Sequence, residues 1–183
     1  MTSFRTILIL VAAFLAVFWE AAFPGTARWL HAQVDLLPPL IVYASLYTGL
    51  TSVALLAVFG GLLFDSLSAN PLGITMVPLF AVGLAVYWQR ELILRDQPYA
   101  QFVLGLGASA ATPLLTVVLL LTAGYPALLG WGSLWQWLVM SLGGAIAAPL
   151  FFLLFGWCER ALGHGPVAET SFRADREIRR GRS

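Results

Sequence analysis

The chain has 183 residues, of which 60% are hydrophobic and only 10% are charged, and its mean hydropathy is +0.85. About a quarter of the residues of a soluble domain are charged, so this composition excludes an ordinary soluble domain. The formal net charge of +1 gives no reason to expect a nucleic-acid partner, and a single cysteine excludes an internal disulfide and a multi-cysteine metal site. Long uncharged runs of about 20 residues suit the 30 Å hydrocarbon core of a bilayer. The sequence predicts an all-α integral membrane protein.

The first predicted span covers residues 4–23 and ends at Pro24-Gly25. It resembles a signal peptide, because Arg5 precedes an apolar run. However, Glu20 and bulky aromatic residues stand where a cleavage site would need small residues. We therefore expect a retained first helix, with Glu20 at the membrane interface.

The next uncharged run, residues 36–64, is too long for a typical single span. The segment TGLTS, residues 48–52, suits a tight turn, because it combines glycine with hydroxylated residues. Splitting the run there gives two short spans, 36–47 and 53–64. Each is short for a full crossing, which implies local thinning of the bilayer, burial behind other helices, or helices that incorporate the turn residues.

Three further spans follow in the sequence. The fourth is expected to begin at Asn70-Pro71, since asparagine is a good N-cap and proline is favoured at the first helical position. It runs to about Trp88, with a kink at Pro78. The fifth covers residues 99–123 with a kink at Pro113, and the sixth covers 134–157. Residues 1–158 are thus predicted to form a six-span membrane domain, and residues 159–183 a flexible cytoplasmic polar tail.

The arginines favour six spans over five. With six spans and the N-terminus inside the cell, Arg5, Arg90, Arg95, Arg160 and the tail arginines are cytoplasmic, and only Arg28 is outside. Five spans would put Arg5 and the tail on opposite sides. The positive-inside rule therefore predicts that both termini are cytoplasmic.

Asp65 is an isolated carboxylate between two long uncharged runs. An aspartate at a helix centre costs about 2.5–3.5 kcal/mol on insertion scales, and less towards the interface. Three interpretations remain open: a span end in contact with water, a cap on the amides of the Asn70–Gly73 segment that pins two spans together, or proton or cation handling. Gly61, four residues earlier on the same helix face, would let another backbone approach.

Small residues form faces on three spans, and such faces permit close helix contact. The candidates include Ala12 and Ala16 in the first span and Gly143 and Gly144 in the sixth. We expect them to pack within the bundle, with docking of a partner's transmembrane helix as the alternative. No GxSxG, HExxH or P-loop motif occurs, so we expect neither catalysis nor a metal or cofactor.

The segment AVFGGLLFDSLSANPLGITM resembles the turn of the rod shape-determining MreD family, a G-x-x-x-D-x-x-S-G-x-x-L-G-like pattern. The residues that match it in order are Gly61, Asp65, Ser68, Leu72 and Gly73, and Asn70 and Pro71 complete the turn. The resemblance extends over about residues 34–90. One departure is Pro38-Pro39, which stands inside the second span rather than before the acid.

The resemblance implies a non-enzymatic component of the bacterial inner membrane that acts in cell elongation and cell shape. Such proteins bind the bitopic protein MreC. They help to regulate peptidoglycan synthesis by a RodA-type glycosyltransferase and its class B penicillin-binding partner, together with MreB. The Asp65 turn would then be structural or would contact a partner.

The main alternative is the substrate-binding S-component of an energy-coupling-factor vitamin transporter. Those proteins are compact six-helix bundles of similar size, and MreD-like proteins are similar to them in architecture. The pair Ala12 and Ala16 resembles their docking face, but the predicted loops offer few polar groups for a vitamin.

Overall fold

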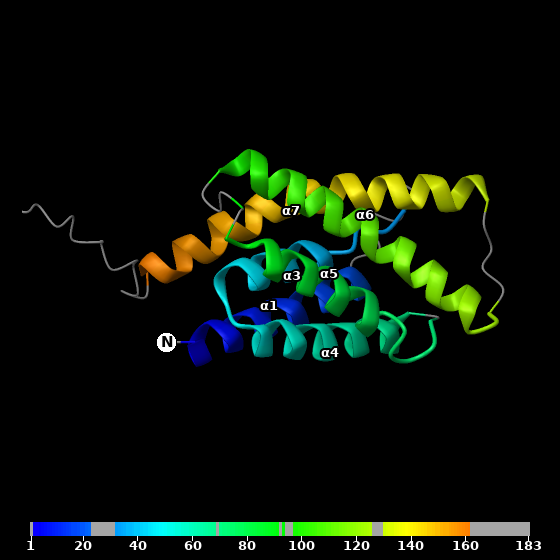
Figure 1. The fold of residues 1–183 in the computed structure, drawn as a ribbon, viewed down its shortest axis with the longest axis horizontal. Coiled ribbons are helices and arrows are strands. Elements are labelled where there is room, and N and C mark those ends of the chain that lie inside the picture. Colours follow the sequence, from blue (N-terminus) through cyan, green and yellow to red (C-terminus); the bar gives the residue numbers. More distant parts are fainter. Residues whose placement is uncertain are drawn as a thin grey trace, which may run out of the picture.

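A computed structural model describes residues 2–22, 32–68, 70–91, 93, 97–125 and 130–161 of the chain (Figure 1). All regular structure in these residues is helical. The six helices are α1 (Thr2–Ala22), α3 (Leu37–Tyr47), α4 (Leu50–Leu67), α5 (Met76–Gln89), α6 (Pro98–Thr122) and α7 (Trp131–Ala161). Four of them, α1, α4, α6 and α7, are long and apolar enough to cross a membrane, whereas α3 and α5 are shorter. The predicted all-helical fold is confirmed in the described residues, and the four long apolar helices are compatible with the predicted membrane protein.

The short helix α3 is the centre of the fold, because it packs against each of the other five helices. Ten of its eleven residues are buried. A helix that is hydrophobic on every side is stable only when it is surrounded in this way. Pro38 and Pro39 lie in its first turn, where a missing N–H removes no helical hydrogen bond. The two prolines therefore start this helix and do not interrupt it.

The helix after α3 begins three residues earlier than the predicted span at residue 53. Only Thr48 and Gly49 separate α3 from α4, because Leu50, Thr51 and Ser52 join the helix. The Oγ of Ser52 lies 2.7 Å from the Oγ1 of Thr6 on α1, so its polar group is paired inside the bundle. For α4, the alternative in which the helix incorporates the turn residues is correct, and α4 gains the length of a full span. For α3, which keeps eleven residues, the alternative of burial behind other helices is correct.

The predicted helix start at Asn70-Pro71 is wrong. Residues 70–75 form a turn, and α5 begins only at Met76. Pro78 consequently lies in the first turn of α5 and not in the middle of a helix, so it has no i−4 carbonyl of the same helix to leave unpaired. The propensity of Asn-Pro for a helix start is overridden here by contacts of the turn with α4, which are described below.

Helices α6 and α7 form a long hairpin that packs over α3. They lie side by side near the start of α6 and diverge toward the end of α6 (Figure 1). Pro113 stands inside α6, as predicted, and Pro149 stands inside the 31-residue α7, which bends in Figure 1. A proline inside a helix removes one backbone hydrogen bond and permits such a bend. Since α7 runs on to Ala161, the expected domain boundary after residue 158 falls within a helix, and residues 162–183 lie outside the described part.

Three arginines lie at one end of the bundle, two of them next to Glu91 and Glu159 in the sequence. The start of α1 and the end of α7, with Arg5 and Arg160, lie at one end, on the left in Figure 1. A Cβ on Gly83 of α5 would touch Val53 near the start of α4, so α5 returns to this end as well and terminates at Arg90. We call it the arginine end. Its position in the cytoplasm remains a prediction, and Arg28 and Arg95 lie outside the described residues.

Candidate functional site

Asp65 lies in the last turn of α4, and its side chain is only 2% exposed. Its Oδ2 accepts hydrogen bonds from the backbone N–H of Gly73, at 2.9 Å, and from that of Thr75, at 3.1 Å. Its Oδ1 accepts a hydrogen bond from the hydroxyl of Thr75. The carboxylate therefore joins the end of α4 to the residues that precede α5. These are the bonds of the capped-turn interpretation, and the burial of Asp65 contradicts a span end in contact with water.

The cap falls only in part on the amides expected. The sequence suggested the amides of Asn70 to Gly73, of which only that of Gly73 is bonded to Asp65. The second amide belongs to Thr75, the residue directly before α5. Gly73 has a φ of +90°, a left-handed conformation that glycine adopts without strain. A glycine at this position lets the turn bend back so that two amides meet one carboxylate.

Gly61 allows α4 and the start of α5 to approach closely. A Cβ at this position would lie 3.0 Å from the backbone N and Cα of Met76, closer than real Cβ atoms normally come. The expected close approach of another backbone is confirmed. Gly61 and Asp65, four residues apart on one helix face, thus contact successive parts of the same segment.

The remaining residues of the motif shape the turn. Ser68 ends α4 and lies near both Asp65 and Asn70: its Oγ is 3.4 Å from the carbonyl oxygen of Asp65 and 3.4 Å from the amide of Asn70. The carbonyl of Pro71 accepts the N–H of Ile74 at 3.3 Å. Leu72 is different, because its side chain is 71% exposed and points away from the core. Ala69 lies outside the described residues.

Two further carboxylates, Glu20 and Asp35, lie at the same end of the bundle, and the sequence analysis did not predict this arrangement. Glu20 of α1 accepts the N–H of Leu36 at 2.7 Å, and Asp35 accepts the N–H of Leu37 at 2.9 Å. These consecutive amides begin α3, where the unpaired N–H groups of a helix attract negative charge. Glu20 is thus a cap on α3 in addition to a residue near a span end. Only the Leu-Pro-Pro start of the following helix could have suggested such a contact.

Burial raises the pKa of Asp35 to about 6, and the hydrogen bond from Leu37 opposes this rise. The side chain is 3% exposed. A small cavity of about 280 Å³ lies beside the pair, lined by Glu20, Gln33 and Ser68 together with apolar side chains of α1 and α4. We call this part of the molecule, defined by Glu20, Asp35 and Asp65, the carboxylate end.

The small residues pack within the bundle where the structure describes them. A Cβ on Gly143 would lie 2.6 Å from Val34, and one on Gly144 would lie 1.7 Å from the Oγ of Ser109. Ala16 is 7% exposed, and Ala12 packs against the core. Glycines 143 and 144 therefore serve contacts within the chain, as expected.

The carboxylate end is built from backbone amides and carboxylates, and this arrangement fixes helix positions. Nothing in the described ranges groups three or more histidine, cysteine, aspartate or glutamate side chains at a distance suitable for a metal ion. Comparison with protein-family models, curated proteins and solved structures finds no match to this chain. The function must therefore be argued from the chain's own residues.

Proposed function

We propose that this chain is a non-enzymatic component of the cell-elongation machinery in a bacterial inner membrane. In this role it binds a bitopic MreC-like protein and helps to regulate peptidoglycan synthesis and cell shape. Four helices suited to membrane spans agree with a multi-pass membrane protein. The more specific proposal depends on the resemblance of one turn, residues 61–73, to the MreD family.

The observation that supports this proposal best is that the resembling residues act together in space. Gly61 admits the backbone of Met76, Asp65 binds the amides of Gly73 and Thr75, and Gly73 has the positive φ. At each of these positions the structure requires one type of residue, for a physical reason. A motif of this kind maintains the shape of the turn, which suits a scaffold protein. Within the described residues, the Asp65 carboxylate already accepts three hydrogen bonds, from Gly73 and Thr75.

The exposed Leu72 gives this turn a surface that a partner could cover. It is 71% exposed at the tip of a turn whose backbone is held by Asp65. An apolar side chain on a rigid turn loses little conformational freedom when a partner buries it. We therefore place the contact with the MreC-like protein at this turn.

Affinity purification from the native membrane in mild detergent, followed by mass spectrometry, tests the proposal. We expect the wild-type chain to retain an MreC-like bitopic protein and the Leu72→Ser variant to retain much less. The matched control is Leu121→Ser, since Leu121 is also an exposed leucine, 52% exposed, at the end of α6. Because neither side chain is buried, both variants should fold.

Two outcomes would contradict the proposal. Wild-type protein that retains no bitopic partner would remove its basis. Recovery of an ATPase module or of a bound vitamin would instead favour the S-component of an energy-coupling-factor transporter. The burial of Ala16 within the bundle leaves less of the α1 small-residue face open for the docking that this alternative requires.

A further inference from the structure

A second region, far from the carboxylate end in sequence, is a groove between α6 and α7. The two helices are in closest contact where Gly105 meets Ala148 and Ser109 meets Gly144. Just beyond, the indole N–H of Trp137 donates a 2.9 Å hydrogen bond to the carbonyl of Ala110. Pro113 follows in α6, and from there the helices diverge (Figure 1). A groove of about 790 Å³ occupies the resulting gap.

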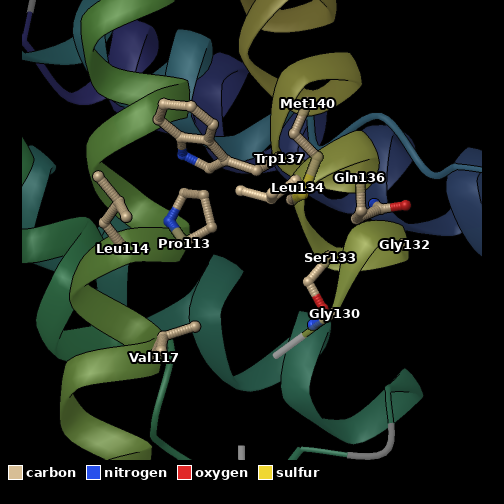
Figure 2. A pocket seen from close by; sticks show the side chains of 10 residues that line it. All are labelled: Pro113, Leu114, Val117, Gly130, Gly132, Ser133, Leu134, Gln136, Trp137 and Met140. Carbon is tan, nitrogen blue, oxygen red and sulfur yellow. Dashed lines mark hydrogen bonds between the residues drawn. The ribbon is translucent and has the colours of Figure 1, made fainter. Parts of the chain in front are cut away.

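The walls of the groove are apolar and firmly held. Figure 2 shows Trp137 between the two helices and Val117 facing the gap. The lining residues that shape it most are Pro113, Leu114, Val117, Leu134, Trp137 and Met140. The hydrogen bond to Ala110 holds the Trp137 ring, so this wall exists before anything binds.

The polar side chains along the groove are already paired. The carboxamide of Gln136 accepts the N–H of Gln33 at 3.0 Å and donates to its carbonyl at 2.9 Å. The Oγ of Ser133 lies 3.4 Å from the amide of Gly130. None of the lining residues is charged. An occupant therefore needs neither charge nor hydrogen-bonding groups, and water would find few partners there.

The surroundings and the size of the groove indicate which apolar occupant fits. Both walls belong to helices that are long and apolar enough to span a membrane, and in a membrane the apolar part of the groove would face hydrocarbon. The volume of about 790 Å³ falls within the range of small-molecule sites, about 300–1,000 Å³. A helix with its side chains is about 10–12 Å wide, so this volume admits less than about two turns of a partner helix. A hydrocarbon chain is narrow enough to enter between α6 and α7.

We propose that the groove between α6 and α7 binds a hydrocarbon chain of a membrane phospholipid as a resident ligand. The chain lies against Val117 and Leu114 on one side and Trp137 and Leu134 on the other. The hydrocarbon chain makes dispersion contacts with the lining side chains, which would have no partner atoms if the groove were empty. Because the groove surrounds the chain on more than one side, this lipid exchanges more slowly than lipids on the outer faces of the helices. This inference does not depend on the proposed role in cell elongation.

Native mass spectrometry of the full chain, extracted from its membrane in mild detergent, tests the inference. We expect wild-type protein to retain one phospholipid through repeated detergent washing. Val117→Trp fills the groove and should abolish retention. The matched control is Val118→Trp, because Val118 is the next residue, 55% exposed and outside the lining, so this variant should retain the lipid.

A second measurement keeps the test decisive if Val117→Trp folds poorly. The protein is reconstituted in phosphatidylglycerol with brominated chains, which quench tryptophan fluorescence, and is then diluted into excess micelles of a mild detergent that carry unlabelled phosphatidylglycerol, so that bulk lipid is replaced rapidly. We expect one slowly recovering component, absent from Trp137→Phe and present in Trp157→Phe. Trp157 is 67% exposed near the other end of α7.

Three results would overturn the inference. In the first, washed wild-type protein carries no lipid while still folded. In the second, Val117→Trp and Val118→Trp lose lipid equally and no slow component belongs to Trp137. In the third, a stoichiometric polypeptide, either a partner or a second copy of the chain, is retained in place of the lipid and is lost in Val117→Trp alone.

Discussion

The carboxylate end and the groove between α6 and α7 show two ways in which this chain joins helices. At the carboxylate end, Glu20 and Asp65 each accept a backbone N–H from the segment that leads into another helix, and Asp35 accepts the N–H of Leu37 within its own segment. Between α6 and α7, contact depends on small residues such as Gly105, and it ceases where the helices diverge after Pro113. Directional hydrogen bonds hold the first region together around a cavity of about 280 Å³, whereas shape-dependent packing leaves a groove of about 790 Å³ in the second.

The difference follows from the physics of the bilayer. Apolar side chains gain little by leaving lipid for one another, so helix association depends on close packing and on polar contacts. Separating a buried carboxylate from the amides that donate to it is costly, because those amides would then lack a hydrogen-bond acceptor. The carboxylate end should therefore be the more rigid of the two regions, and the groove the one that adapts to a ligand.

Removing the Asp65 carboxylate should have the largest effect. Asp65→Leu leaves the N–H groups of Gly73 and Thr75 and one hydroxyl without an acceptor. Each unpaired buried group costs about 1–3 kcal/mol, so we expect a loss of about 3 kcal/mol or more in the free energy of unfolding. Denaturant unfolding in detergent micelles measures it. Ser66→Leu, one residue further along α4 and exposed, should change little. Equal effects of the two variants would show that the turn does not depend on this carboxylate.

Replacing a glycine of α6 by alanine should have a smaller effect on stability. Whether it destabilises or stabilises the chain depends on which glycine is replaced. A Cβ on Gly105 would lie 2.5 Å from the Cβ of Ala148 and 2.7 Å from the carbonyl oxygen of Gly144, whereas one on Gly107 meets nothing within 4 Å. We expect Gly105→Ala to destabilise by about 1–3 kcal/mol through overpacking. Gly107→Ala should stabilise by up to about 1 kcal/mol through helix propensity. Thermal unfolding of the pair compares them, and a stabilised Gly105→Ala would refute the close packing of this hairpin.

Titration of Asp35 should change the stability of the unsubstituted chain with pH. Its pKa is about 6 in the folded chain, above the ordinary value of 3.8, so the folded state holds its proton more tightly than the unfolded state does. This contribution to stability is complete below about pH 4 and is lost as the pH rises through 6. The melting temperature of the wild type should therefore fall by a few degrees between pH 4 and pH 7.

The control for this titration is Asp35→Asn, which cannot lose a proton in this range. We expect its melting temperature to vary less across the same interval than that of the wild type. Parallel curves for the two proteins would assign the pH dependence to another group, with Glu20, the neighbouring carboxylate on α1, as the first to examine.

The sequence by itself determined the class of protein and the positions of most helices. Uncharged runs of membrane length predicted α1, α6 and α7 to within a few residues, because burial in hydrocarbon requires continuous apolar segments. The turn residues at 48–52 predicted α3 by dividing a longer run. The motif around Asp65 also predicted a carboxylate cap and a close backbone approach at Gly61. These are local properties, since every partner lies within about 15 residues along the chain.

Only the tertiary structure decided where α5 begins, how α3 begins and where the groove lies. The start of α5 moves from Asn70 to Met76 because Asp65 and Gly61 hold the intervening turn against α4. The cap of Glu20 on Leu36 joins residues 16 apart, with a segment outside the described residues between them. The groove depends on the direction of two helices after Pro113, and hydropathy carries no information on direction. Each of these features depends on which segments meet in space. A pattern of residues along one helix does not carry that information.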